Sequence, residues 1–239
     1  KAADRYAATA FVDAARHLRQ AKAGDLARQL DLVEAGLKRA HGCAAGWLLV
    51  GELAAAEDMT LAQKKYWADN LQKMCGKEYP DFSMSVLKPM IQTVQDTAEQ
   101  NALWNACFQF FAARSDLAAE TRMAQAEMWE KAGEPVKAGK CYEDVLTRFI
   151  NSGPFAIEAL KRTEQKLREL ERESRVPGMY AAAWAKCRKP GGMTPDLMRG
   201  TNWVQIGLMY ATVLEQAGQA AQAARVRAEV EKLAGPSKF

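Results

Sequence analysis

The sequence has few of the residues that favour β-strands, with 12 Val and 4 Ile among 239 residues. Alanine, the residue with the highest helix propensity, occurs 44 times. Hydrophobic residues make up 49% of the chain and charged residues 26%, a composition that excludes a disordered protein. We therefore expect an all-α protein whose core needs neither metals nor disulfides.

Long apolar runs are missing too. No stretch approaches the roughly 18 uninterrupted apolar residues of a membrane span. The first twenty residues carry six charged side chains, unlike a signal peptide. The sequence also opens at Lys1 without an initiator Met, so we expect that an upstream segment was removed or left out. These features predict a chain without a membrane span.

Neither the charge nor the cysteines point to a ligand class. The net charge is only +4, which is too small over this length to indicate nucleic-acid binding. The cysteines are at least 32 residues apart and form no CxxC pair: Cys43, Cys75, Cys107, Cys141 and Cys187. That spacing excludes compact zinc and thioredoxin-type motifs, and we expect buried, reduced thiols. Reduced thiols favour the cytoplasm slightly, with the cell envelope as an alternative.

Patterns typical of enzymes are also missing. No GxSxG elbow, HExxH helix or dinucleotide-binding glycine motif occurs. Residues 133–140 look briefly like a phosphate-binding loop, but five residues separate the two glycines where that motif has four. His17 and His41 are the only histidines. We therefore expect no enzymatic activity, no metal and no cofactor.

Helix terminators and helix caps alternate along the chain at regular intervals. Between them lie segments of about 12 to 20 residues with apolar positions three and four apart. One such segment contains Leu26, Leu30, Val33 and Leu37. The sequence predicts about 10 to 12 helices, and their short connections make consecutive helices antiparallel neighbours.

Two segments, residues 128–146 and 209–230, match when they are aligned on a turn glycine. Each has a large apolar residue four positions before the glycine and an alanine five positions after it. These residues are Trp129, Gly133 and Ala138 in one segment and Leu214, Gly218 and Ala223 in the other. Trp47 and Gly51 supply a matching first helix elsewhere. The pattern resembles the tetratricopeptide repeat, a helix–turn–helix unit of about 34 residues.

The resemblance implies a right-handed α-solenoid of antiparallel helix hairpins, which we expect to form one repeat domain over residues 1–239. Cys107 and Cys141 support the period, because they lie 34 residues apart. Gly133 and Gly218 lie 85 residues apart, which is no multiple of 34. We therefore expect an irregular insertion at about residues 153–203.

In this family the first helix of each unit lines a concave groove. The resemblance nominates ten residues by spacing: Leu48, Glu52, Glu120, Met123, Glu127, Glu130, Gln205, Leu208, Thr212 and Glu215. A row of glutamates beside a methionine suits a basic or amphipathic partner segment. The same glutamates also fit a solvated helix face, and the sequence favours neither interpretation.

A second candidate surface is the locally basic loop with Lys186, Arg188, Lys189 and Arg199. Trp184 and Trp203 flank residues 188–196, which form either a ligand-contacting lip or a long turn covered by its own tryptophans.

The leading hypothesis is a noncatalytic scaffold that binds a partner protein or peptide in its groove. The alternatives are a helical-repeat protein that contacts RNA through the basic loop, and a scaffold that assembles with itself.

Overall fold

A computed structural model describes residues 2–56, 59–75 and 78–235. These residues form thirteen α-helices, one short 3-10 helix and no strand, so the prediction of an all-α protein is confirmed. Twelve of the described helices have 11 or more residues, and the thirteenth, α11, has 5. None of the helices in this part of the chain combines the length and apolar character that crossing a bilayer requires.

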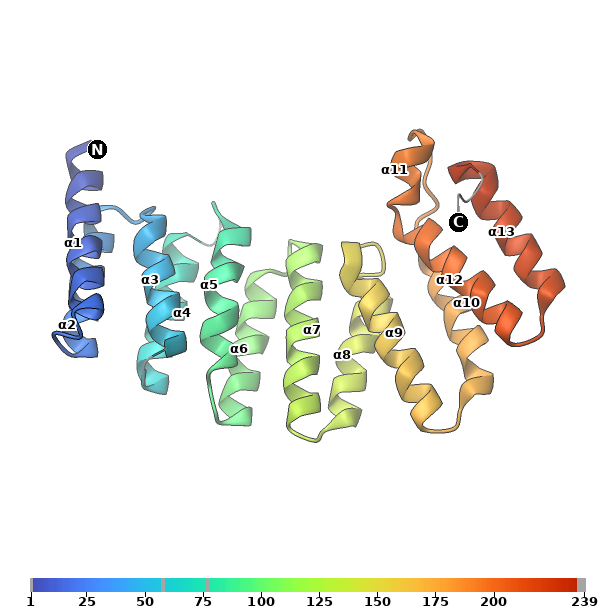
Figure 1. The fold of residues 1–239 in the computed structure, drawn as a ribbon, viewed down its shortest axis with the longest axis horizontal. Helices are drawn as coiled ribbons and strands as arrows, with labels where there is room; N and C mark the ends of the chain where they lie inside the picture. The colour runs from blue at the N-terminus through green and yellow to red at the C-terminus, as the bar shows by residue number, and fades with distance from the viewer. Residues whose placement is uncertain (1, 57–58, 76–77, 236–239) are drawn as a thin grey trace. The chain divides into compact units, whose positions relative to one another are not determined.

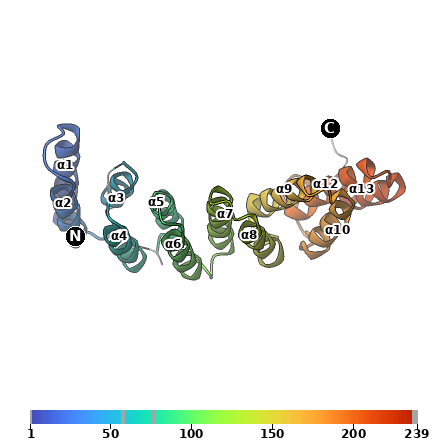
Figure 2. The ribbon, with the colours of Figure 1, turned by 90° about the horizontal axis from the view of Figure 1, so that it is seen from below.

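Contacts divide the chain into two compact units, residues 1–111 and 112–239, and each is described by itself. The first unit contains α1 (Ala2–Gln20), α2 (Leu26–Arg39), α3 (Ala44–Ala56), α4 (Leu61–Met74), α5 (Pro80–Gln92) and α6 (Thr97–Phe110). Consecutive helices form antiparallel hairpins (Figure 1), and α1, α3 and α5 contact one another in turn. Within this unit α3 and α5 form one layer, and α4 and α6 form the other (Figure 2). The expectation of a single domain over residues 1–239 stays a prediction.

Side chains cap several helices of the first unit where the sequence places cap residues. Asp25 accepts a hydrogen bond from the Arg28 backbone N–H at 2.8 Å and begins α2. Thr60 and Gln63 form a reciprocal capping box at the start of α4. These caps satisfy backbone N–H groups that the first turn of a helix leaves without partners, and so they fix where the helices begin.

The second unit contains α7 (Ser115–Lys131), α8 (Pro135–Arg148), α9 (Gly153–Glu169), α10 (Val176–Lys186), α11 (Pro195–Arg199), α12 (Asn202–Gln216) and α13 (Ala220–Ala234). Its hairpins are α7–α8, α9–α10 and α12–α13. The first helices α7, α9 and α12 contact one another in turn, and in Figure 2 they lie on the side opposite α8 and α10.

The two turn glycines that the sequence analysis aligned have the same backbone geometry. Gly133 has a φ of +71° and Gly218 a φ of +74°, in the left-handed region that favours glycine. After each glycine, a backbone N–H bonds a carbonyl five residues earlier: Glu134 to Trp129 and Gln219 to Leu214, both at 2.8 Å. This is the Schellman motif, which ends a helix and satisfies its last carbonyls.

The same turn occurs twice without glycine. Lys22 (φ +50°) ends α1 and Glu171 (φ +55°) ends α9, and the corresponding backbone bonds join Ala23 to Leu18 at 2.9 Å and Arg172 to Leu167 at 2.8 Å. The structure thus contains a regular hairpin at residues 153–186, inside the span expected to be an irregular insertion. The part outside the hairpins is residues 187–201. The sequence analysis missed this hairpin because a glutamate stands where it sought a glycine.

Gly207 on α12 allows the helices of the second unit to approach closely. A Cβ built on this residue would lie 2.8 Å from Trp184 Nε1 on α10 and 2.8 Å from Val230 Cγ2 on α13. Atoms of ordinary size cannot pack at such distances, so any larger residue would displace the Trp184 and Val230 side chains. Gly207 therefore helps to fix how α10, α12 and α13 pack together.

Candidate partner-binding site

In the first unit, the structure places the two nominated residues Leu48 and Glu52 on the surface of α3, one helical turn apart. The Leu48 side chain is 43% exposed. The Glu52 carboxylate forms an ion pair with Arg19 of α1, with 3.0 Å between Oε2 and Nη1. Glu52 therefore joins two first helices to each other, and its charge is already matched within the unit.

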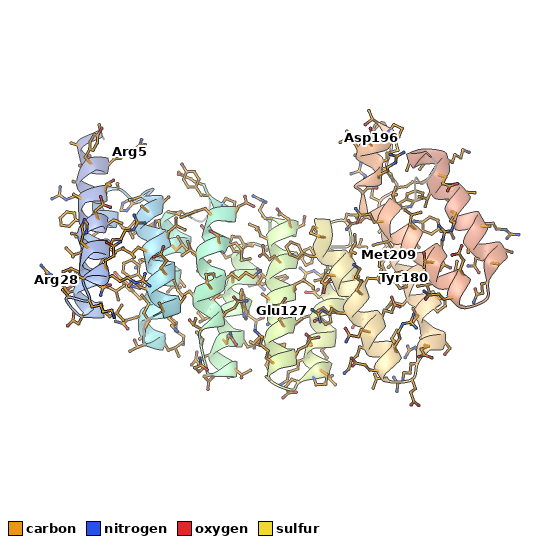
Figure 3. All side chains as sticks on the ribbon, viewed as in Figure 1. Arg5, Arg28, Glu127, Tyr180, Asp196 and Met209 are labelled. Atoms are coloured by element: carbon orange, nitrogen blue, oxygen red, sulfur yellow. The ribbon has the colours of Figure 1, made fainter. Side chains whose placement is uncertain are left out.

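In the second unit, the nominated glutamates follow one side of α7. Glu127, labelled in Figure 3, and Glu130 are exposed, whereas Glu120 is half-buried. Neither Glu127 nor Glu130 forms an ion pair with a Lys or Arg of the described chain. Asp116 extends this side, and its hydrogen bond with Arg114 lowers the pKa of the Asp116 carboxyl. We call Asp116, Glu120, Glu127 and Glu130 the acidic face of α7.

Met123 does not belong to this surface. It is only 6% exposed, so the expectation that it gives a partner adaptable apolar contact is wrong. The reason is that α7 packs against both α8 and α9, and this contact buries a broad sector of the helix. Spacing along one helix could not reveal how wide that sector is.

The nominated residues of α12 offer less to a partner. Arg227 of α13 holds the Glu215 carboxylate through two bonds of 2.9 and 3.0 Å. The hydrogen bond from Arg227 lowers the pKa of Glu215. The exposed Thr212 hydroxyl donates to the Leu208 carbonyl, and the Gln205 amide donates to the Gly200 carbonyl at 3.3 Å. The Leu208 side chain is half-buried.

A cavity of about 490 Å³ lies beside the end of the acidic face. Its walls come from the last turn of α7, the first half of α8 and the second half of α9. The lining residues are Glu130, Pro135, Ala138, Gly139, Tyr142, Arg162, Thr163, Gln165, Lys166, Leu167 and Glu169. Of these, the sequence analysis nominated only Glu130. The others belong to the second helix of one hairpin and to the hairpin that it missed, so no single-helix pattern could group them.

Tyr142 contributes a buried hydroxyl to this cavity. The residue is 5% exposed, and its hydroxyl is buried beside the Glu130 carboxylate. Burial, and then a hydrogen-bond interaction with Glu130, raise the pKa of Tyr142 well above its ordinary value. The phenol is therefore neutral at physiological pH.

The basic residues around the cavity are paired with acids of α9. Arg162 Nε donates to Glu158 at 2.9 Å, and this bond raises the pKa of Arg162. Glu169 accepts hydrogen bonds from Lys166 and Gln165, both at 3.1 Å, and the bond from Lys166 lowers its pKa. The Glu130 carboxylate forms no ion pair within the described residues, although the charge of Arg162 acts on it.

The basic loop surrounds a different cavity, of about 580 Å³, that Arg188 and Lys189 help to line. Two of its four basic residues form ion pairs: Lys189 with Glu229 at 2.6 Å and Arg199 with Asp196 at 3.1 Å. Lys186 and Arg188 are exposed.

The flanking tryptophans pack on each other, with ring centroids 5.2 Å apart. Trp184 Nε1 also donates to the Trp203 carbonyl at 2.9 Å, and Trp203 is 4% exposed. The two tryptophans therefore pack on each other, and Trp203 also lines the cavity of the basic loop.

All five cysteines are free thiols, and four of them are buried. Burial raises the pKa of both Cys141 and Cys187 to about 11. Within the described residues, no three His, Cys, Asp or Glu side chains are grouped so that they could hold a metal ion.

No protein-family model matches the sequence, and no curated protein matches it. One solved structure that the chain matches is described as "Crystal structure of BtubC (BKLC) from P. vanneervenii". The two chains are 16% identical, the match covers 96% of this chain and 89% of that chain, and the TM-score is 0.41. Both the identity and the TM-score are too low to indicate a shared function.

Proposed function

We propose that the second unit is a noncatalytic protein-interaction module that binds a basic or amphipathic segment of a partner protein along α7, α9 and α12. The observation that supports this function best is the pair of exposed carboxylates on α7, Glu127 and Glu130. They lie one turn apart on one helix face, and Glu130 also lines the cavity beside α8 and α9.

The charge distribution favours a cationic partner. Like charges that lie close together on a helix repel one another, and a bound cation relieves this repulsion. Several other acids of the second unit, such as Glu158 and Glu215, already have an arginine partner. Glu127 and Glu130 are the groups for which a partner's lysine or arginine supplies the missing positive charge.

The helix arrangement is compatible with the tetratricopeptide resemblance, which implies a binding surface on the first helices of successive hairpins. A segment lying across α7, α9 and α12 would contact three hairpins at once. An amphipathic segment could also bury its apolar residues against half-buried positions such as Leu208.

RNA contact through the basic loop is less well supported, because Glu229 and Asp196 offset two of its four positive charges. Self-assembly is a separate alternative, and sedimentation at several protein concentrations distinguishes it from binding by a monomer.

The test uses a fluorescein-labelled amphipathic peptide of Lys and Leu, and a matched peptide with Glu in place of Lys. We expect fluorescence anisotropy to show binding of the Lys–Leu peptide alone, with an affinity that falls as salt increases. Glu127→Gln should weaken that binding. Glu143→Gln is the matched control, because Glu143 is exposed on α8 and outside the acidic face. Equal binding of both peptides, or equal effects of the two variants, would contradict the proposal.

A further inference from the structure

We propose that the cavity beside Glu130 is a receptor for one cationic side chain, a lysine or arginine, of the bound segment. This inference rests on the proposed function and adds the position where specificity arises. It is built from three features of the cavity: its apolar wall, an open glycine on α8, and the Glu130 carboxylate beside the buried Tyr142 hydroxyl.

The cavity has the shape that a long basic side chain requires. Pro135, Ala138, Gly139 and Leu167 provide apolar surface for the methylene stem. Glu130 provides a carboxylate for the charged end. Lysine and arginine commonly bury their stems against apolar surface while the charged end reaches polar groups. Pockets for ligands typically measure roughly 300 to 1,000 Å³, and this one measures about 490 Å³.

Gly139 indicates that the space beside α8 is kept open. It lies inside the helix, where glycine is less favourable than alanine. Its backbone φ is not positive, and a Cβ built on it would meet nothing within 4 Å. Neither the backbone nor packing within the chain therefore requires a glycine here. The position lines the cavity, so a ligand that approaches the helix closely accounts for it.

Tyr142 and Glu130 give the cavity its charge preference. The Tyr142 hydroxyl is buried, and its interaction with Glu130 orients that carboxylate at the cavity. A bound ammonium or guanidinium would donate to the Glu130 carboxylate. Arg162 acts on Glu130 as well as on Glu158, but three carboxylates here (Glu130, Glu158 and Glu169) face two cations (Arg162 and Lys166), so the net charge is negative. That sign selects a cation over an anion.

The experiment is a lysine-to-alanine scan of the Lys–Leu peptide against wild-type protein and Gly139→Leu. In the wild type, we expect one lysine to dominate, with a loss of affinity of about tenfold when it is removed. The leucine of Gly139→Leu projects into the cavity, so in this variant the same lysine should lose its special effect. A flat scan in the wild type, or an unchanged scan in the variant, would overturn the receptor site.

Two further measurements keep the proposal testable if Gly139→Leu does not fold. Tyr142→Phe removes only the hydroxyl, and we expect it to weaken peptide binding about fivefold. N-acetyl-lysine N-methylamide should also bind the wild-type protein and shift the NMR signals of the Tyr142 ring, and this shift should be lost in Glu130→Gln. Unchanged binding by Tyr142→Phe, or the absence of a saturable shift, would refute the site.

These results separate the two proposals. If the Lys–Leu peptide binds and Glu127→Gln weakens it, but the lysine scan is flat, the proposed function holds and the receptor site fails. If no Lys–Leu peptide binds, the proposed function fails. The acetyl-lysine amide then decides the receptor site on its own.

Discussion

In the four Schellman turns, we expect substitutions at glycine and non-glycine positions to have opposite effects on the free energy of unfolding. Glycine occupies the left-handed position at Gly133 and Gly218, whereas Lys22 and Glu171 occupy it in the other two turns. A residue with a Cβ costs roughly 1 to 2 kcal/mol in the left-handed region. Glycine avoids that cost, but it lowers the free energy of unfolding by about 0.5 to 1 kcal/mol because it gives the unfolded chain more conformational freedom.

From these values, we expect Glu171→Gly to raise the free energy of unfolding by about 0.5 to 1 kcal/mol. Gly133→Ala should lower it by about 1 kcal/mol. In a chain of this size, 1 kcal/mol corresponds to a Tm change of roughly 2 to 4 °C. Glu171 also lies just beyond the C-terminus of α9, where a negative charge is unfavourable. Glu171→Gln removes that charge and leaves a Cβ in the turn, so it isolates the backbone effect.

Scanning calorimetry of the full chain measures these Tm changes. Gly139→Ala is the matched control for Gly133→Ala, because Gly139 lies in an ordinary helical conformation with open space around it. We expect the same substitution to raise the Tm at position 139 and to lower it at position 133. If both changes shift the Tm in the same direction, or if Glu171→Gly is no more stable than Glu171→Gln, the backbone argument is refuted.

Three other predictions follow from contacts in the second unit and from the thiols. Gly207→Ala should lower the free energy of unfolding by about 1 to 3 kcal/mol, because its methyl group would overlap two helices; urea denaturation measures this, and full stability would count against the close packing. Asn202→Ala removes hydrogen bonds of 2.7 and 2.8 Å to two backbone carbonyls and should lower the free energy of unfolding by about 1 to 3 kcal/mol. A Tm equal to that of the wild type would contradict this. Thiols with a pKa of about 11 are ionised in roughly one molecule in a thousand at pH 8. A thiol reagent should therefore spare Cys141 and Cys187 in the native protein. It should react first with the half-buried Cys43. Rapid reaction of Cys141 or Cys187 would show that it is not buried.

Helix positions were the most predictable feature of this chain. Gly133 and Gly218 were identified as turns because the left-handed conformation is a local property that one residue type satisfies best. The turn at Glu171 was missed for the same reason: local backbone hydrogen bonds hold a glutamate in a conformation that its residue type does not predict. Residue type therefore indicates most helix ends, but it fails where a residue other than glycine adopts the left-handed conformation.

The candidate site was only partly predictable. Spacing on one helix placed Glu127 and Glu130 on the surface of α7, where they are found, but it placed the buried Met123 beside them. Spacing could not nominate Tyr142 or Gly139, because the cavity forms only where three helices meet.

The sequence by itself determined the all-α class, most of the helix boundaries and the two glycine turns, since propensity, capping and backbone conformation depend on neighbouring residues. Tertiary structure alone decided which face of each helix is buried, which carboxylates have arginine partners, and where a cavity remains. These properties depend on contacts between residues far apart in the chain, and no local pattern encodes them.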